Sequence, residues 1–192
     1  YGGGTNDAFI VKFNSNGGRI WSSYYGGESD DPAWGVSTDD QGNVFITGTT
    51  SSNWNIAFGG HQNSFAGGGS DAYLVKFNSF GNRIWSTYFG GPGGEIGTSV
   101  ITDNNGNVFI GGYTLSTTGI SYLGFQNSHA NPMDNDAYLA KFDPLGSRIW
   151  STYFGGVNTD SGCVLASDGT NVFLAGYTNN TAGIAYNGFQ NN

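Results

Sequence analysis

The sequence predicts an all-β fold made of short antiparallel strands and many tight turns. Of its 192 residues, 34 are Gly and 16% are aromatic, while only 10% are charged. Ordinary globular chains carry about 7% Gly and about 25% charged residues. The abundance of Gly, Asn, Ser and Thr disfavours helices, and the aromatic content is too high for a disordered chain. The length suits one domain with a sizeable core.

The second observation behind this fold class is a threefold internal repeat. The segment RIWSSYYGG at 19–27 returns as RIWSTYFGG at 83–91 and at 148–156. The segments NVFITG, NVFIGG and NVFLAG recur in the same way, as do DAFIVKF, DAYLVKF and DAYLAKF, at a spacing of 64 or 65 residues. The repeats tile the chain as one region without a linker, in three units: 1–64, 65–128 and 129–192.

Each unit contains four segments that are expected to form β-strands and are separated by turn residues. The turns within the first and the last pair, NSNGG and DDQGN in the first unit, contain Asn and Gly, which readily adopt the positive φ angles of tight turns. In the first unit the expected strands are Asp7–Phe13, Arg19–Tyr25, Ala33–Thr38 and Asn43–Thr49.

The first expected strand carries apolar side chains on both of its faces, with Phe9, Val11 and Phe13 on one and Ala8 and Ile10 on the other. A strand of this kind must be covered on both sides. Small four-stranded sheets that stack against their own copies provide that cover. Repeats of this length with four antiparallel strands are typical of propeller blades, so we predict an all-β β-propeller built of four-stranded antiparallel blades.

The repeat resembles that of a bacterial β-propeller family, SBBP. The likeness rests on DAFIVKFN, RIWSSYYGG and GVSTDDQGNVFITGTT, and it covers nearly the whole chain three times over. GVSTDDQGNVFITG also resembles the inner strand pair of NHL-type propeller repeats. The resemblance indicates the architecture of the chain but says little about its activity. Because similar repeats occur in large secreted or surface-attached bacterial proteins, it implies an extracellular or cell-surface location.

In the NHL-like alignment the chain begins and ends with complementary halves of a blade. The last two strands of each unit become the inner strands A and B, and the first two strands of the next unit become the outer strands C and D. Residues 7–25 then lack an inner half, and residues 162–178 lack an outer half. Propellers typically have about four to eight blades, so the chain is either part of a larger ring or half of a six-bladed ring of two chains. We expect the first, because the sequence starts in mid-blade and without Met.

The charge balance argues against several partners. The net charge is −8, and the chain has six basic residues. Nucleic-acid binding needs clustered Lys and Arg, and an anionic membrane surface is equally disfavoured. No apolar run reaches the roughly 18 residues that would span a bilayer. Cys163 is the single cysteine, so no disulfide can form within the chain, and we interpret it as an inert buried thiol.

The six basic residues occupy repeat-equivalent positions beside the turn between strands C and D. We expect them to form ion pairs between blades, or to lay their stems over apolar surface, rather than to bind an anion. They are Lys12, Lys76, Lys141, Arg19, Arg83 and Arg148.

The long, variable connections between strands are all predicted on one face of the propeller, because the turns of an antiparallel meander alternate between two faces. Variable loops on a rigid scaffold often carry function, so we expect binding on this face. Its acidic residues form either a Ca²⁺ site or a solvated rim, and no loop has the regular Asp spacing of a known Ca²⁺ motif. They are Glu28, Asp30, Asp31, Glu95, Asp134 and Asp160.

Two further sets of repeat-equivalent Asp residues are expected to serve the fold. One set begins strand C and should accept hydrogen bonds from the backbone or from Lys and Arg; the other lies in the A–B turns, where Asx turns explain it without a metal. The sets are Asp7, Asp71 and Asp136, and Asp39, Asp103 and Asp168.

Aromatic residues in or beside the long loops are candidates for ligand contact. Trp34, Trp54 and Phe65 have Asn, Asp and Gln nearby in the sequence, and such a combination can stack on sugar rings and hydrogen-bond their hydroxyls. The alternative is that the aromatic rings fix the loops to their blades. The recurrence of Ile56 and Gln62 in every repeat favours this alternative for most of the loop.

Catalysis has little support in the sequence. Motifs of serine hydrolases, zinc peptidases and phosphate-binding loops are absent. Glu28 and Glu95 offer the one carboxylate pair that a glycoside hydrolase would need. We therefore predict a non-enzymatic extracellular propeller module, without an assigned cofactor, in a structural, adhesive or protein-interaction role. A lectin-like module is the alternative, and a hydrolase is less favoured. The expected partners are other blades of the same longer chain or a second copy, and surface proteins or glycans.

Overall fold

The computed structural model describes residues 2–190, and in this range the chain forms strands joined by turns and loops. The strands, in chain order, are β1 (Ala8–Phe13), β2 (Arg19–Tyr25), β3 (Ala33–Thr38), β4 (Val44–Thr50), β5 (Asp71–Phe77), β6 (Arg83–Phe89), β7 (Glu95–Thr102), β8 (Val108–Thr114), β9 (Asp136–Phe142), β10 (Arg148–Phe154), β11 (Asp160–Ser167) and β12 (Val172–Thr178). The four strands expected in the first repeat are confirmed to within one residue at each end.

The strands form two complete four-stranded sheets and two strand pairs, all antiparallel. The complete sheets have the orders β3-β4-β5-β6 and β10-β9-β8-β7. The pairs are β1-β2 at the N-terminal end and β11-β12 at the C-terminal end. Each complete sheet therefore joins the last two strands of one repeat to the first two of the next, as the alignment of the repeats predicts.

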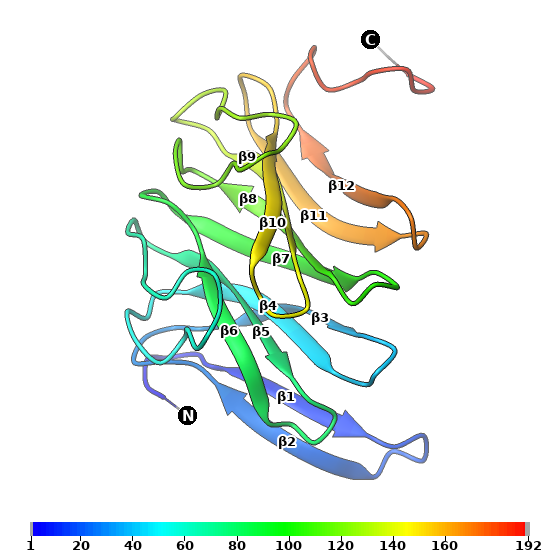
Figure 1. The fold of residues 1–192 in the computed structure, drawn as a ribbon. Coiled ribbons are helices and arrows are strands. Elements are labelled where there is room, and N and C mark those ends of the chain that lie inside the picture. Colours follow the sequence, from blue (N-terminus) through cyan, green and yellow to red (C-terminus); the bar gives the residue numbers. More distant parts are fainter. Residues whose placement is uncertain (1, 191–192) are drawn as a thin grey trace.

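The sheets stack one above another like an open fan, with β1-β2 at one end and β12 at the other (Figure 1). Strand β7 packs against both β3 and β4, and β11 packs against β7 and β8 in the same way. The stack of residues 2–190 does not close on itself, so the ring expected from the sequence is represented here by an arc.

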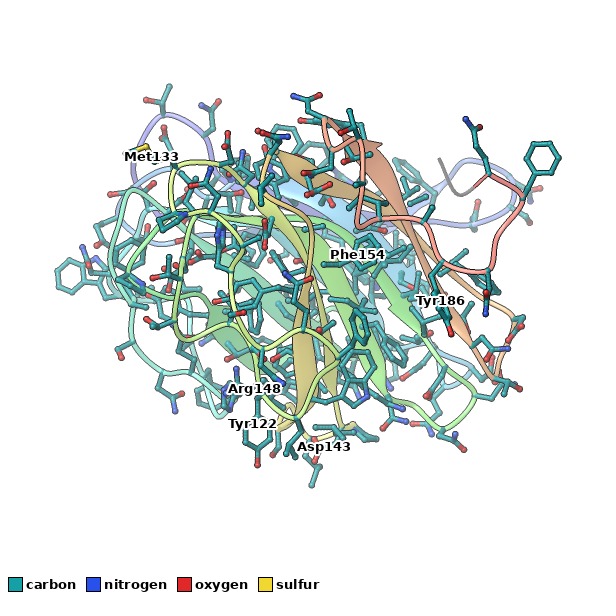
Figure 2. All side chains as sticks on the ribbon, turned by 90° about the horizontal axis from the view of Figure 1, so that it is seen from above. Tyr122, Met133, Asp143, Arg148, Phe154 and Tyr186 are labelled. Atoms are coloured by element: carbon teal, nitrogen blue, oxygen red, sulfur yellow. The ribbon has the colours of Figure 1, made fainter. Side chains whose placement is uncertain are left out.

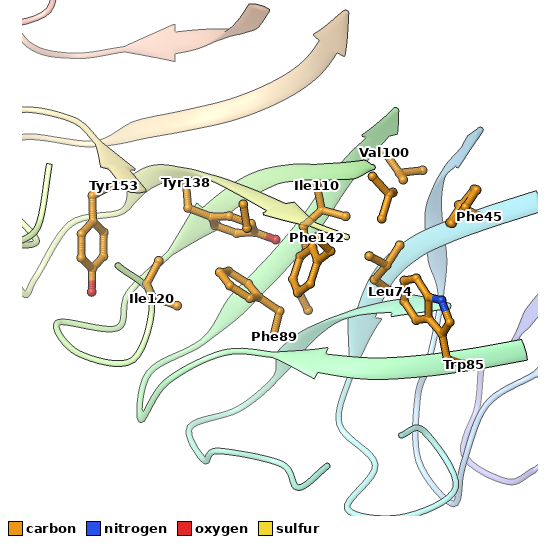
Figure 3. Packing of buried hydrophobic residues seen from close by; sticks show 13 residues of the cluster. Phe45, Leu74, Trp85, Phe89, Val100, Ile110, Ile120, Tyr138, Phe142 and Tyr153 are labelled. Atoms are coloured by element: carbon orange, nitrogen blue, oxygen red, sulfur yellow. The ribbon is translucent and has the colours of Figure 1, made fainter. Parts of the chain in front are cut away.

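The hydrophobic core lies between successive sheets. One cluster fills the space between the two complete sheets, where the ring of Phe89 lies 5.0 Å from that of Tyr138 and 6.0 Å from that of Phe142 (Figure 3). A second cluster joins the β1-β2 pair to the first complete sheet through Tyr25, whose ring centroid is 5.1 Å from that of Tyr73. Apolar residues on both faces of the middle strands are thus covered by neighbouring sheets, because a strand that is apolar on both faces must be covered on both sides.

The glycine that recurs in strand B is required by a bulge in strand A. In the second complete sheet the register shifts between Gly97 and Ser99, opposite Gly112. The bulge brings the carbonyl oxygen of Ile96 so close to Gly112 that a Cβ atom there would overlap it. Gly48 and Gly176 face Pro32 and Ser161 in the same way. The Gly of the recurring segment NVFxxG is therefore needed because two backbones approach each other closely at this position.

Neighbouring sheets are also joined by hydrogen bonds to the turn between strands C and D. Trp21 Nε1 and Lys12 Nζ both donate to the Ser79 carbonyl, at 3.0 and 3.3 Å. One blade further on, Trp85 Nε1 and Lys76 Nζ donate to the Pro144 carbonyl, at 3.0 and 3.4 Å. The basic residues thus join blades through carbonyl groups.

Candidate interaction surface

The long loops that follow strand B run along the outer strand D of the same sheet. Phe58 exchanges two backbone hydrogen bonds with Ser86 of β6, each of 2.9 Å, and Tyr88 N–H donates to the Gln62 carbonyl. Tyr122 and Gln126 bind β10 in the same register. The loops are therefore fixed to the outer rim of their blades, which is the alternative that the recurring residues favoured.

Gln62 joins the loop to two other elements of its blade. Its side-chain amide donates to Asp71 Oδ2 at 3.0 Å, and its Oε1 accepts the N–H of Gly90 at 3.1 Å. Ala66 N–H donates to the same Asp71 oxygen at 2.9 Å. Asp71 thus accepts hydrogen bonds at the start of strand C, as predicted, and it organises the end of the long loop.

Phe65 belongs to this packing. Its ring meets that of Tyr88 edge-on, with centroids 6.2 Å apart. His129 occupies the equivalent place beside Tyr153, with centroids 5.6 Å apart. The position of Phe65 therefore serves the attachment of the loop to its blade.

The acidic residues at the start of strand A are buried within their blades. Asp31 accepts hydrogen bonds from Gly27 N–H, Ser52 Oγ and Thr50 Oγ1. Glu95 accepts them from Gly91 N–H at 2.9 Å and Thr114 Oγ1 at 2.6 Å. Each carboxylate ties the D–A loop to the end of strand B. Asp160 has the corresponding role, with Gly156 N–H and Asn180 Nδ2 as donors.

Burial changes the titration of these carboxyl groups. Desolvation raises the pKa of Asp71 to about 7, and the nearby Glu95 adds to the rise. Desolvation likewise raises the pKa of Asp31, Glu95 and Asp136 above their ordinary values. Asp103, in an A–B turn, behaves in the opposite way, because hydrogen bonds from Asn107 and Asn105 and the charge of Lys141 outweigh its slight desolvation and lower its pKa.

The other two acidic candidates of the first repeat hold nearby loops. Glu28 Oε1 accepts the N–H of Asn53 at 2.8 Å, beside the exposed Trp54. Asp30 Oδ1 accepts the N–H groups of Thr5 and Asn6, at 2.5 and 3.1 Å. Within residues 2–190, His, Cys, Asp and Glu form no group of three that could hold a metal ion.

Trp34 lies away from the long loops, on the open side of the first complete sheet. It is 61% exposed and lines a groove of about 730 Å³ together with Phe9, Ile10 and Val36. The structure therefore separates Trp34 from Trp54, which the sequence placed on one face.

The Arg residues of strand D lie over aromatic rings of the long loops. The guanidinium carbon of Arg83 is 5.1 Å from the ring centroid of Phe58, and that of Arg148 is 5.0 Å from the ring centroid of Tyr122. Arg148 also donates to the Gly119 and Ile120 carbonyls. Tyr122 and Arg148 lie together at one edge of the molecule (Figure 2). These Arg side chains thus cover apolar surface, which is one of the two expected roles; the ion pairs expected between blades are not seen among the described residues, where Lys141 pairs with Asp103 within one sheet.

The second long loop carries a group of apolar side chains that these contacts leave in solvent. Leu123 and Phe125 are 76% and 85% exposed, next to Tyr122 and Arg148. We call these four residues the Tyr122 patch. The repeat pattern alone does not mark Leu123 and Phe125 as contact residues, although it carries a signal: the equivalent residues of the first repeat are Gly59 and His61, which are small or polar.

Leu123 in this patch has a left-handed backbone conformation, which is unusual for a Leu residue. Its φ angle is +51°, whereas the equivalent positions hold Gly59 and Asn187, at +64° and +50°. Gly and Asn tolerate this left-handed conformation, but a Leu there costs roughly 1–2 kcal/mol. An exposed apolar residue in a strained conformation gains nothing for the fold and suggests a functional contact.

Comparisons with known proteins agree with the architecture. Residues 84–118, from β6 through β8 into the following loop, match the family described as "SBBP: Beta-propeller repeat". The chain is 27% identical over 212 residues to "Uncharacterized WD repeat-containing protein L264" of Acanthamoeba polyphaga mimivirus, covering 96% of this chain and 15% of that protein. It is 24% identical over 109 residues to "Regulatory protein FlaEY" of Caulobacter vibrioides, covering 57% of this chain and 11% of that protein.

Fold and comparisons together define a class: an all-β chain with propeller-type repeats, of a kind that suggests a protein-interaction module. The resemblance to SBBP repeats is confirmed for residues 84–118. The bacterial source that it implies stays a prediction, since one relative is viral. The chain spans only a small part of the length of these two relatives. In the part of the chain that is described, there is no helix with the length and apolar character of a membrane span.

Proposed function

We propose that the chain is a non-enzymatic protein-interaction module of a β-propeller, with the Tyr122 patch as its main contact. The observation that carries this proposal is Leu123, an exposed apolar side chain held at a positive φ angle where the neighbouring repeats have Gly and Asn. A protein partner would cover its side chain and those of Tyr122 and Phe125.

The composition of the patch fits a binding hot spot. Aromatic residues and Arg are enriched at the centres of protein interfaces. The Tyr122 ring lies against Arg148, and the backbone of Tyr122 exchanges hydrogen bonds with that of Ser151, so little conformational freedom is lost when a partner binds. A rigid loop on a sheet scaffold is a common site of recognition.

The setting of this module is proposed to be extracellular, in an adhesive or structural role. Support comes from the resemblance to secreted repeat proteins and from the scarcity of Lys and Arg. The proposal needs no cofactor and no catalytic group. Glu95, one of the two glutamates that a hydrolase would use, is fully buried and accepts hydrogen bonds from its own loop.

A selection from a phage-displayed library of random dodecapeptides tests the Tyr122 patch. We expect selected peptides to bind the chain and to lose about tenfold in affinity, or about 1.4 kcal/mol, when Leu123→Asn and Phe125→Ser are combined. Phe80→Ser is the matched control, because Phe80 is a similarly exposed ring in the turn between β5 and β6. Peptides that bind all three proteins equally well would contradict the proposal.

Glycan binding through Trp54 is a second candidate, favoured by its exposed ring beside the Asn53–Glu28 contact. A glycan array probed with the wild type and with Trp54→Ala separates it from the first. Array binding that needs Trp54 and does not change with Phe125→Ser would support the lectin-like role.

A further inference from the structure

The two strand pairs at the ends of the arc are complementary halves of one sheet. In the complete sheets, strand B pairs with strand C, as β4 does with β5 and β8 with β9. The pair β11-β12 ends at a strand B, and the pair β1-β2 begins at a strand C. Of the two arrangements that the sequence allows, we propose the second for this chain of 192 residues: β12 of one copy pairs with β1 of a second copy, so that two copies close a ring. This inference is independent of what the Tyr122 patch binds.

The register of this pairing follows from the two complete sheets. Val44 lies opposite Phe77, and Val108 lies opposite Phe142. The far ends of the same strands pair Thr50 with Asp71 and Thr114 with Asp136. Transferred to the junction, Val172 faces Phe13 and Thr178 faces Asp7. Ala175 and Ile10 then meet in the centre, as Thr47 and Leu74 do in the first complete sheet.

The turn between strands C and D offers a second match. The indoles of Trp21 and Trp85 lie over Gly81 and Gly146, and each donates to a carbonyl of that turn, Ser79 and Pro144. Trp150 is the third member of the series. The turn that would receive its indole is the β1-β2 turn of another copy, where Ser15 and Gly17 are equivalent to Ser79 and Gly81. Within residues 2–190, and apart from its two chain neighbours, no heavy atom lies within 4 Å of a Cβ position at Gly17. The space over Gly17, where the indole of Trp150 from a second copy would pack, is therefore not filled by the described residues of the same chain.

The Arg–aromatic pairs provide a third match. Arg83 and Arg148 each lie over a ring of the preceding loop, Phe58 and Tyr122. The remaining members of the series stand at opposite ends of the arc: Arg19 on β2, and Tyr186 in the loop after β12. Tyr186 is 87% exposed on the C-terminal loop (Figure 2). Closure of the ring places it over Arg19 of the next copy.

The apolar surfaces at the two ends also correspond. At the N-terminal end lies the groove of about 730 Å³ lined by Phe9, Trp34 and Val36. At the C-terminal end, Leu174 and Tyr177 line a smaller hollow of about 280 Å³. In the complete sheets the equivalents of Phe9, which are Tyr73 and Tyr138, are fully buried. The occupant that fits is the pair β11-β12, because its repeat-equivalent pairs fill the same place within the chain.

Two copies joined in this way make a six-bladed ring, since each has two complete sheets and the two junctions supply the others. Six lies within the usual range of about four to eight blades. Closure also leaves no strand edge of the junction exposed.

Light scattering after size exclusion, at micromolar concentration, tests the closed pair. We expect the wild type at twice the chain mass of 20.2 kDa, and Phe9→Lys at the single mass, because it places a charge in the covered groove. Phe80→Lys, which alters an exposed ring outside the junction, should remain a pair. A wild type of single mass, or a growing series of polymers, would overturn the inference.

Disulfide cross-linking between copies tests the register and does not depend on the folding of Phe9→Lys. In a background of Cys163→Ser, one chain carries Ala175→Cys and the other Ile10→Cys. We expect oxidation to give a covalent pair for this mixture and at least tenfold less for Ala175→Cys mixed with Phe13→Cys, which is out of register. Equal cross-linking in both mixtures, or none in either, would refute the proposed pairing.

Discussion

Strands β1 and β5 carry nearly the same sequence but lie in different surroundings. The segments are DAFIVKF and DAYLVKF. All residues of β5 are buried, whereas β1 exposes side chains on one of its two faces. Phe9 is 71% exposed, and the equivalent Tyr73 is 0% exposed. The difference is the inner strand pair β3-β4, which β5 has beside it and β1 lacks. Burial in this fold is thus decided by the neighbouring strands rather than by a strand's own residues.

At the C-terminal end, the burial of strand B depends on its neighbours in the same way. Strand β8, VFIGGYT, is almost entirely buried, while β12, VFLAGYT, is mostly exposed. Here the missing neighbour is an outer pair. Substitutions at equivalent positions should therefore have unequal effects on stability, and the size of the inequality measures how far each end is covered in solution.

The largest effect is expected at the covered strand. Tyr73→Ala should lower the free energy of unfolding by about 3 kcal/mol, because the ring of Tyr73 is fully buried between sheets. Phe9→Ala on β1 should cost under about 1 kcal/mol at concentrations where the chain is single. Urea denaturation followed by tryptophan fluorescence measures both. Equal losses would show that β1 is as well covered as β5, and a loss for Phe9→Ala that grows with concentration would show that a second copy supplies the cover.

An intermediate effect concerns the carboxyl group at the start of β5. The folded state raises the pKa of Asp71 to about 7 from an ordinary value of 3.8, so folding favours its protonated form. The stability that this proton contributes is complete below pH 4, falls as the pH rises and is lost above pH 7.

Asp71→Asn should remove part of this pH dependence, on the order of 2 kcal/mol between pH 4 and pH 8. This is about half of what the full pKa shift would give at about 1.4 kcal/mol per unit, because solvent and neighbouring dipoles screen the charge. Thermal melts across that range measure it. Asp7→Asn, at the partly exposed equivalent position, is the control for the loss of a carboxyl group at the start of strand C. An unchanged slope in Asp71→Asn would contradict the role of this group.

The smallest effect is expected in the second long loop. Leu123→Asn should raise the free energy of unfolding by up to about 1 kcal/mol, because Asn tolerates the left-handed backbone that Leu strains. Gly59→Leu in the first loop should have the opposite sign. Differential scanning calorimetry resolves shifts of this size, and a destabilised Leu123→Asn would show that the Leu side chain supports the fold after all.

Much of this fold follows from local sequence signals. The strands and the Gly-containing turns repeat three times in the sequence, so each is predicted by comparison within the chain, and the half-sheets at the two ends follow from the alignment of the repeats. Asp39 accepts hydrogen bonds from Gln41 and Asn43 N–H groups, which is the Asx turn expected there. Repetition supplies here the evidence that an alignment of relatives would otherwise give.

The binding surface was harder to predict, because exposure depends on contacts between distant segments. Asp31 was interpreted as part of an acidic face, but Thr50 and Ser52 reach it from the end of β4 and bury it. A signal existed: the second repeat has Glu95 with Thr114 and Ser116 in the same places. Trp34 could not be placed, since its surroundings depend on a strand pair that the described arc lacks.

The docking of the long loops along β6 and β10 also bears on solubility. A bare outer edge would invite the strands of other molecules to add on and start a fibrillar aggregate. Phe58 and Gln62 occupy backbone groups along one such edge, and Tyr122 and Gln126 do so along the other. Sideways growth of the sheets at these two edges is thereby obstructed, so the aromatic-rich outer strands are shielded from pairing with other molecules.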